Sequence, residues 1–90
     1  MHFEWDSEKE KTNIKKHGIS FHTAQLVFTD NNHLEFYDEM HSTAKEERYI
    51  ALGNIGKILF VVFTEKNNIT RIISARPANT AERKLYYGNY

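Results

Sequence analysis

The sequence predicts an α+β fold with two N-terminal helices, a four-stranded antiparallel sheet and a C-terminal helix. Three observations predict it. Polar residues with helix-capping signals fill the first part of the chain, four stretches of strand length follow with short turns between them, and a capping motif opens the last segment. Short links make neighbouring strands antiparallel. Ninety residues suffice for one domain, which we expect to span residues 1–90, with its helices on one sheet face.

The first helix is expected to begin at Asp6 or Ser7 and to end at His17. Ser7 and Glu10 stand at the spacing of a capping box, and Gly18 supplies a left-handed C-cap. The helix is very polar, so we expect it to lie on the surface and to be attached to the rest of the fold through its two ends.

The second helix is expected from Phe21 to Phe28, with Ser20 as its candidate N-cap. Its apolar residues share one face by the three-and-four rule. Residues 3–5 alternate apolar and polar side chains, a pattern long enough only for a short edge strand or a packed arm.

The strands are expected in the middle and the last third of the chain. They comprise residues 34–38, 46–53, 58–64 and 70–77. The third is the most apolar, so we expect it at the centre of the sheet. The last strand ends at Pro77, because proline cannot extend a ladder.

The last helix is expected from about Thr80 to Tyr87. Asn79 is its candidate N-cap, and Glu82 stands three residues further on, where its side chain can reach back to the cap. Arg76 therefore lies at the mouth of the sheet, near a helix that carries more basic and phenolic groups. This placement indicates an anion site, although a salt bridge that seals the sheet edge is the alternative.

Composition limits the chemistry and the partners. The chain has no cysteine, which excludes disulfides and thiolate metal sites. No His-x-x-x-His pattern with a carboxylate is present, so we expect no metal site and no cofactor. The longest apolar run is only of strand length, and the N-terminus lacks a signal-peptide pattern, so we expect a cytoplasmic protein without membrane contact.

The net charge is zero, but the charges are unevenly spread. Residues 30–47 carry six acids and one base, a balance of −5, whereas residues 66–90 carry five bases and one acid, a balance of +4. The C-terminal part therefore suits an anion, and the acidic stretch suits either a solvated sheet edge or a basic segment of a partner.

Several motifs together resemble one known family. In chain order they are Phe3-Glu4-Trp5-Asp6, Lys9, Asn13, Lys16-His17-Gly18-Ile19-Ser20-Phe21, Glu47-Arg48-Tyr49 with Gly53, Arg71-Ile72-Ile73-Ser74-Ala75-Arg76, and Glu82-Arg83 with Tyr86. This set is similar to the BrnT family of bacterial type II toxins. Pro77 stands where the family has alanine, with Ala78 next.

The resemblance implies a RelE-like fold and a ribonuclease that halts translation. It also implies a BrnA-like antitoxin as partner, in a 2:2 heterotetramer. The antitoxin carries the DNA-binding domain, so the toxin would meet DNA only indirectly. Two other functions stay open on the residues alone: a non-catalytic interaction module, and a gyrase poison like the ParE members of the same superfold.

RNA cleavage without a metal needs a base for the ribose 2′-OH, a cation for the crowded phosphate and an acid for the leaving oxygen. Arg76 is the first choice for the cation and Arg48 the second, because guanidinium forks onto phosphate oxygens. His17 is the acid–base candidate, with Lys16 beside it. Since RelE-like nucleases often lack a histidine pair, Glu82 is an alternative base.

Contacts to RNA are expected from Lys16, Arg83, Lys84 and Tyr86, the last as a hydroxyl donor or a base-stacking platform. Structural roles are open for the three other catalytic candidates besides Arg76. His17 and Glu82 can each cap a helix. Arg48 can instead form a cross-strand ion pair with one of three acids: Glu35, Asp38 or Glu46.

Overall fold

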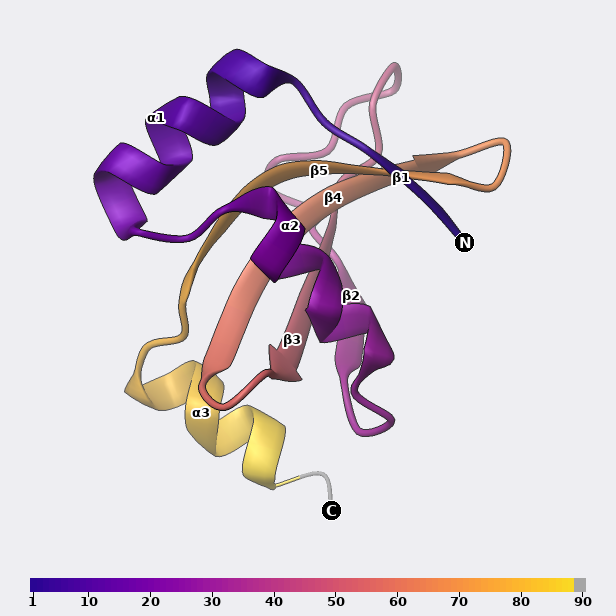
Figure 1. Ribbon diagram of the computed structural model, residues 1–90. Coiled ribbons are helices and arrows are strands. Elements are labelled where there is room, and N and C mark those ends of the chain that lie inside the picture. The colour runs from indigo at the N-terminus through magenta and orange to yellow at the C-terminus, as the bar shows by residue number, and fades with distance from the viewer. Residues whose placement is uncertain (89–90) are drawn as a thin grey trace.

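A five-stranded sheet with three α-helices makes up the computed structural model, which describes residues 1–88 (Figure 1). The elements are β1 (His2–Glu4), α1 (Ser7–His17), α2 (Phe21–Ala24), the 3₁₀ helix η1 (Gln25–Thr29), β2 (Leu34–Tyr37), β3 (Tyr49–Asn54), β4 (Ile58–Lys66), β5 (Ile69–Pro77) and α3 (Thr80–Tyr87). The strand order is β1-β5-β4-β3-β2, so the α+β class and the central place of β4 are confirmed. No helix in residues 1–88 is long and apolar enough to cross a membrane.

The expected four-stranded antiparallel sheet is wrong in one respect, because β1 adds a fifth strand that runs parallel to β5. His2 pairs with Ile69 and Glu4 with Arg71, and the Arg71 guanidinium donates to the Glu4 carboxylate at 2.7 Å. The element order therefore begins with a strand. Three residues are too short to show a strand period, and their partner lies 67 residues away along the chain.

Caps at both ends fix α1. Asp6, and not Ser7, is the N-cap, and its carboxylate accepts two backbone N–H groups of the first turn. Gly18 ends the helix with a φ of 71°, as expected for a left-handed C-cap. The capping box expected from Glu10 is not formed. Its carboxylate instead accepts the backbone N–H of Phe21 at 2.8 Å and so joins α1 to α2.

The second helix is shorter than expected, because α2 continues after one turn as the 3₁₀ helix η1. Phe21, Ala24 and Val27 are buried on one face, as the period predicts. They pack on the inner face of the sheet, which we define by Ala51, Val61, Phe63, Ile72 and Ala75. The contact is close at Gly53, where a Cβ atom would stand 2.5 Å from Val27 Cγ1.

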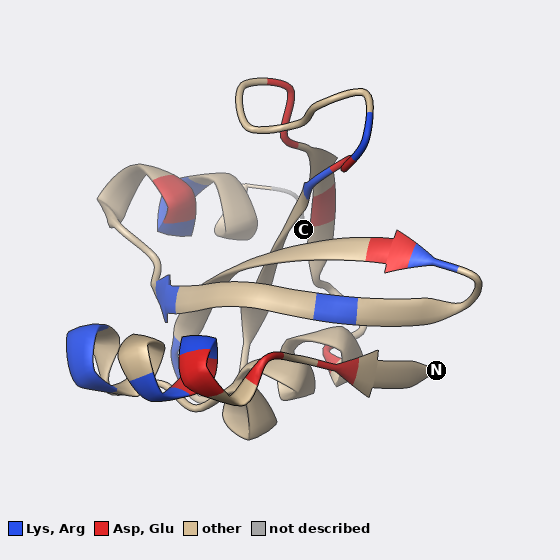
Figure 2. Cartoon of the chain, turned by 90° about the horizontal axis from the view of Figure 1, so that it is seen from above, with Lys and Arg blue, Asp and Glu red and all other residues tan. Residues whose placement is uncertain are grey.

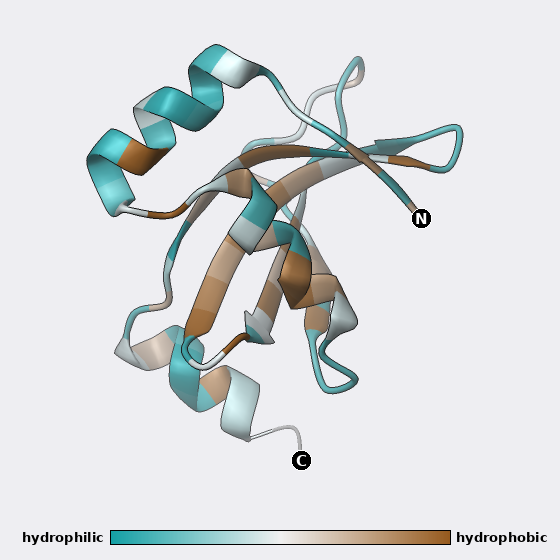
Figure 3. Cartoon of the chain, viewed as in Figure 1, coloured by the Kyte–Doolittle hydropathy of each residue, from teal (hydrophilic) through white to brown (hydrophobic). Residues whose placement is uncertain are grey.

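The opposite, outer face of the sheet is only partly covered. Helix α3 packs over one end of it, where Tyr86 and Ala78 cluster with Leu52 and Ile58. The remaining outer face carries apolar side chains of β4 such as Phe60, and Figure 3 shows β4 as a hydrophobic strand in a molecule whose α1 is almost wholly hydrophilic. The expected partly open sheet face is therefore present, but the expectation that the helices lie on one sheet face is wrong, because α3 packs on the outer face and α2 on the inner one.

A bulge in β5 changes which residues face outward. Val62 pairs with Ser74 and Phe63 with Ile72, so Ile73 has no partner of its own on β4. The extra residue places both Ile73 and Ser74 toward the outer side while Ile72 stays in the core. Bulges of this kind re-aim side chains beside functional sites.

Asn13 joins α1 to the free edge of β5. Strand β1 pairs with β5 only as far as Arg71, so Ala75 has no strand neighbour on that side. The side-chain amide of Asn13 takes the place of the missing strand. Its nitrogen donates to the carbonyls of Ala75 at 2.8 Å and Ile19 at 2.9 Å, and its oxygen accepts the Ala75 N–H at 3.1 Å. Asn13 is only 6% exposed, so these bonds hold α1 in register with the bulge.

Candidate active site

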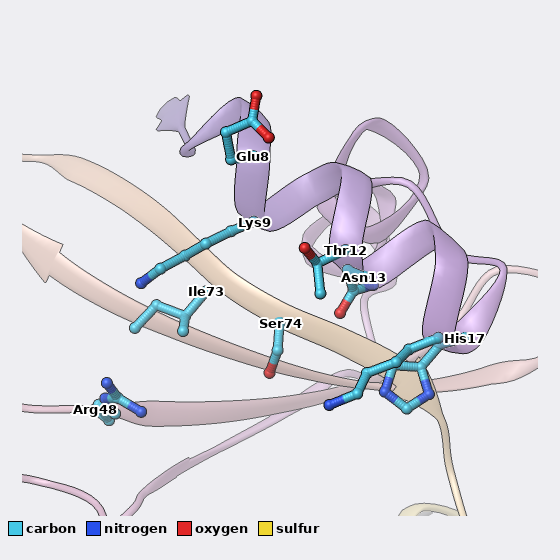
Figure 4. A pocket seen from close by; sticks show the side chains of 9 residues that line it. Glu8, Lys9, Thr12, Asn13, His17, Arg48, Ile73 and Ser74 are labelled. Atoms are coloured by element: carbon cyan, nitrogen blue, oxygen red, sulfur yellow. The ribbon is translucent and has the colours of Figure 1, made fainter.

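A hollow of about 490 Å³ lies between α1 and β5, and it brings together residues from distant parts of the chain (Figure 4). Helix α1 contributes Glu8, Lys9, Thr12, Asn13, Lys16 and His17, strand β5 contributes Ile73 and Ser74, and Arg48 comes from the residue before β3. We call it the first hollow. Figure 4 shows Arg48 and His17 at opposite sides of Ile73 and Ser74.

The α1 side of the first hollow is a polar stripe. Four polar residues of α1 share one helix face because they are spaced three or four positions apart around it: Lys9, Thr12, Asn13 and Lys16. Acidic residues stand in the first turn of α1 and basic ones in the last, as Figure 2 shows. Three basic side chains and one acid line the hollow besides His17, which gives it a positive charge suited to phosphate.

Arg48 occupies the wall opposite α1. Its Nε donates to Glu46 at 2.9 Å, so one of the three expected ion pairs is formed. Within residues 1–88 its terminal nitrogens have no hydrogen-bond partner, and the side chain is 33% exposed. The ion pair therefore orients the guanidinium and leaves its fork available to an anion.

The His17 side chain is exposed at the end of α1 and lines the first hollow. The cap of the helix is Gly18, whose N–H donates to the carbonyl of Ile14 at 2.7 Å. The His17 ring has no hydrogen-bond partner among the described residues, so the alternative role as a helix cap is not the one seen.

A second hollow of about 370 Å³ lies over the open sheet face and shares Arg48 and Ser74 with the first. Its lining residues are Asp38, His41, Arg48, Ile50, Phe60, Val62, Ser74 and Arg76. Three of them are apolar, and they form a floor between two arginines. The two hollows thus meet at Arg48.

Arg76 lies in the second hollow, but its guanidinium is already paired. Both terminal nitrogens donate to the Glu82 carboxylate at 2.8 Å, and the group stands over the Phe60 ring at 3.9 Å. Glu82 also accepts the N–H of Asn79, which completes the expected capping box of α3. The salt bridge that was the alternative for Arg76 is therefore present. Because strand β4 separates β3 from β5, Arg48 and Arg76 face one hollow without their strands pairing.

This pairing perturbs both groups. The hydrogen bonds from Arg76, followed by burial that opposes them and by the N–H of Asn79, hold the pKa of Glu82 below its usual value. The same bond to Glu82, against a smaller opposing effect of burial, raises the pKa of Arg76. A carboxylate held in this way is a weak proton acceptor, which disfavours Glu82 as the base.

Glu82→Gln is expected to lower the free energy of unfolding by about 1 kcal/mol at pH 7, since the pair is partly exposed. Because the folded pKa lies below the ordinary value of 4.5, this stabilisation is present above pH 4.5 and is lost as the pH falls through the folded value. Thermal melts of both proteins from pH 7 to pH 3 should therefore converge. A gap in melting temperature that stays constant over this range would contradict the role, and Glu8→Gln, at an 80% exposed carboxylate, is the matched control.

The other expected RNA contacts lie outside both hollows. Arg83 donates to the carbonyl of Ala78 at 2.8 Å and to the Thr80 hydroxyl at 3.1 Å, so it stabilises the start of α3. Lys84 is exposed on α3. Tyr86 is 2% exposed, and its hydroxyl donates to Asp30. Burial leaves no ring face on which a base could stack, so Tyr86 is a core residue and the expected stacking role is wrong.

Six of the nine residues that line the first hollow are not among the expected site residues, and Lys9 and Ser74 are two of them. The signal for Lys9 is present in the sequence, because it stands seven residues before Lys16 on a helix that has little apolar surface. The signal for Ser74 is not, since its direction depends on the bulge at Ile73. Among residues 1–88 no three His, Asp or Glu side chains stand close enough together to hold a metal ion.

Comparison with known proteins assigns this arrangement to a class. The model of the family described as "Ribonuclease toxin, BrnT, of type II toxin-antitoxin system" matches residues 5–82. Among solved structures, the 1.1 Å crystal structure of the ribonuclease toxin BrnT from Brucella abortus is similar, with a TM-score of 0.68 and 32% identity over 89% of this chain and 99% of that one. No curated protein sequence matches the chain significantly.

The fold is thus that of a small ribonuclease toxin. The chain belongs to the BrnT family of ribonuclease toxins of type II toxin–antitoxin systems. The resemblance found in the sequence motifs is confirmed, and the ribonuclease function is the one of the three hypotheses that the family supports. RNA is therefore the substrate and an antitoxin is the partner of this class.

Proposed function

We propose that the protein is a metal-independent endoribonuclease that cuts RNA where its two hollows meet. The observation that carries this proposal is the position of Arg48, which belongs to both hollows and keeps its terminal nitrogens unbonded within residues 1–88. A scissile phosphate at this point would lie between the polar face of α1 and the apolar floor of the outer sheet face.

The chemistry is attack of the ribose 2′-oxygen on the adjacent phosphorus. The 2′-O–P bond forms, the P–O5′ bond breaks, one group takes the proton of the 2′-OH and another gives a proton to O5′. Arg48 would stabilise the negative charge that accumulates on the phosphoryl oxygens, because its fork is preorganised by Glu46. His17 would transfer one of the two protons, and Lys9 and Lys16 would hold the flanking phosphates.

Arg76 has a supporting role in this proposal. Its charge is offset by Glu82, so it contributes to the wall of the second hollow more than to direct phosphate binding. Arg83 and Lys84, which lie on α3, would at most contact RNA beyond the two hollows.

Purified protein should cut RNA in the presence of EDTA and leave a 2′,3′-cyclic phosphate and a 5′-hydroxyl, both measurable by mass spectrometry of an oligonucleotide. A single 2′-deoxynucleotide at the cut position should abolish that cut. Cleavage that requires Mg²⁺ or leaves a 5′-phosphate would contradict the proposal, because metal-activated water attacks phosphorus directly and does not use the 2′-OH.

The remaining features follow from the family resemblance. We propose a single toxin domain at residues 1–90 that acts in the cytoplasm, halts translation, and is bound by a BrnA-like antitoxin in a 2:2 heterotetramer in which only the antitoxin contacts DNA. The mass of the co-expressed complex by light scattering tests the stoichiometry. A 1:1 or 1:2 mass would exclude it.

A further inference from the structure

A histidine–carboxylate pair stands in the second hollow. The Asp38 carboxylate accepts the backbone N–H of His41 at 3.3 Å, and its two oxygens lie 3.0 and 3.2 Å from the His41 Nδ1. The Asp38 side chain is only 11% exposed, whereas the imidazole is 67% exposed. A sheltered carboxylate therefore fixes Nδ1 as the protonated nitrogen and leaves Nε2, which has no partner within residues 1–88, directed to the surroundings.

The loop that carries this pair is tied to Arg48 through the backbone. The Asp38 N–H donates to the Arg48 carbonyl at 2.8 Å. The Ser42 hydroxyl accepts the Arg48 N–H at 2.8 Å and donates to the Asp38 carbonyl at 2.6 Å. The loop that carries His41 is consequently fixed against the backbone of Arg48.

Two imidazoles thus flank one arginine. His17 lines the first hollow, His41 lines the second, and Arg48 lines both. Transesterification needs two proton transfers on opposite sides of the phosphorus, one at O2′ and one at O5′, with the cation between them. One imidazole in each hollow and the shared Arg48 match these three groups in kind.

We propose that His41 is a catalytic residue for RNA cleavage, the second proton-transfer group beside His17, and that Asp38 is its positioning residue. This inference rests on the proposed site at Arg48. In the reaction one imidazole takes the proton of the 2′-OH as the 2′-O–P bond forms. The other imidazole gives its proton to O5′ as the P–O5′ bond breaks, so the pair ends the step with its protons exchanged.

The sequence alone does not reveal this role. His41 stands in a loop and has no neighbour in sequence that marks it, and Glu82, the alternative base expected from the sequence, is bound to Arg76 and Asn79. The other three imidazoles lie elsewhere: His2 is in β1, His22 is beside Glu10, and His33 is held between Asp30 and Glu35. None of the three lines either hollow.

The test compares His41→Ala, His17→Ala and the control His22→Ala, whose 73% exposed ring lies outside both hollows. Two oligonucleotides serve as substrates, with a single ribonucleotide and either oxygen or sulfur at the bridging 5′ position. On the oxygen substrate His41→Ala and His17→Ala should each lose about 10²-fold or more in kcat, while His22→Ala should stay within twofold of the wild type, as expected for a ring outside the site. Binding of a 2′-O-methyl oligonucleotide should be unchanged in all three, which shows that they are folded.

The sulfur substrate separates the two roles. A thiolate leaves without a proton, so the variant that lacks the acid should regain most of its rate, and the variant that lacks the base should not. Rescue of both variants or of neither would overturn the division of roles, and full activity of His41→Ala on the oxygen substrate would overturn the role of His41. Loss of cleavage in Arg48→Ala together with full activity in His41→Ala would leave the proposed function intact, whereas an inactive wild type would contradict that function itself.

Asp38→Asn tests the positioning role. It should lower kcat and alter the pH–rate profile on the oxygen substrate while the affinity for the 2′-O-methyl oligonucleotide stays constant. An unchanged profile would limit Asp38 to holding the loop, and would overturn its positioning role.

Discussion

Replacing Arg48 by alanine is expected to lower kcat for RNA cleavage by about 10²–10³-fold, the effect of removing one preorganised donor to a transition-state oxyanion. The reason is its place where the two hollows meet, with the terminal nitrogens unbonded within residues 1–88 and Nε held by Glu46. The backbone bonds of Arg48 to Asp38 and Ser42 remain in the variant, so its stability should change little. Initial rates with a fluorogenic oligonucleotide provide the measurement.

Two matched variants sharpen this prediction. Arg48→Lys should recover only part of the rate, because an ammonium keeps the charge but not the fork. Arg71→Ala removes a different arginine, one that pairs with Glu4 outside both hollows, and should leave the rate nearly unchanged. If Arg48→Ala kept more than half of the wild-type rate, the site would lie elsewhere.

Asn13→Ala is expected to lower the free energy of unfolding by about 3 kcal/mol, which is large for one substitution. Three buried backbone groups lose a partner at once: the carbonyls of Ile19 and Ala75 and the N–H of Ala75. Denaturant unfolding measures the change. The variant should also cleave RNA more slowly, because Asn13 fixes α1 and hence His17 against the bulge of β5.

The control for Asn13 is Lys15→Ala, an exposed position two residues further along α1. It should change stability by less than about 0.5 kcal/mol, as surface substitutions usually do. A loss below about 1 kcal/mol in Asn13→Ala would mean that water replaces the lost bonds, and the amide would not be the link between α1 and β5.

Much of the fold follows from local signals in the sequence. The C-cap at Gly18 and the capping box of Asn79 and Glu82 define helix ends through contacts within a few residues, so both were predictable. The pairing of β1 with β5 was not, since it joins the two ends of the chain and β1 has only three residues. The N-cap was assigned to either of two residues, and the structure selects Asp6 because Glu10 bonds to Phe21 instead.

The site was predictable in part. Arg48, Lys16 and His17 were identified by chemistry and family resemblance, and the structure brings them into one hollow. The stacking role of Tyr86 is wrong because the ring is buried against Leu52 and Ile58, which lie far from it in the sequence.

The sequence does not show which of the two arginines is free to bind an anion, because Arg76 and Arg48 both stand near acidic residues. In the structure Glu82 binds both terminal nitrogens of Arg76. Glu46 binds only the Nε of Arg48. In the proposed site the order of the two cations is therefore reversed with respect to the expectation from sequence.

The most direct test of the account is to map RNA onto the folded protein. A 2′-O-methyl oligonucleotide, which cannot be cut, is titrated into ¹⁵N-labelled protein, and backbone amide shifts are followed by NMR. We expect the largest changes in α1 from Thr12 to His17, and at Arg48 and Ser74, where the two hollows meet. Changes confined to α3, or to the hairpin between β4 and β5, would contradict it.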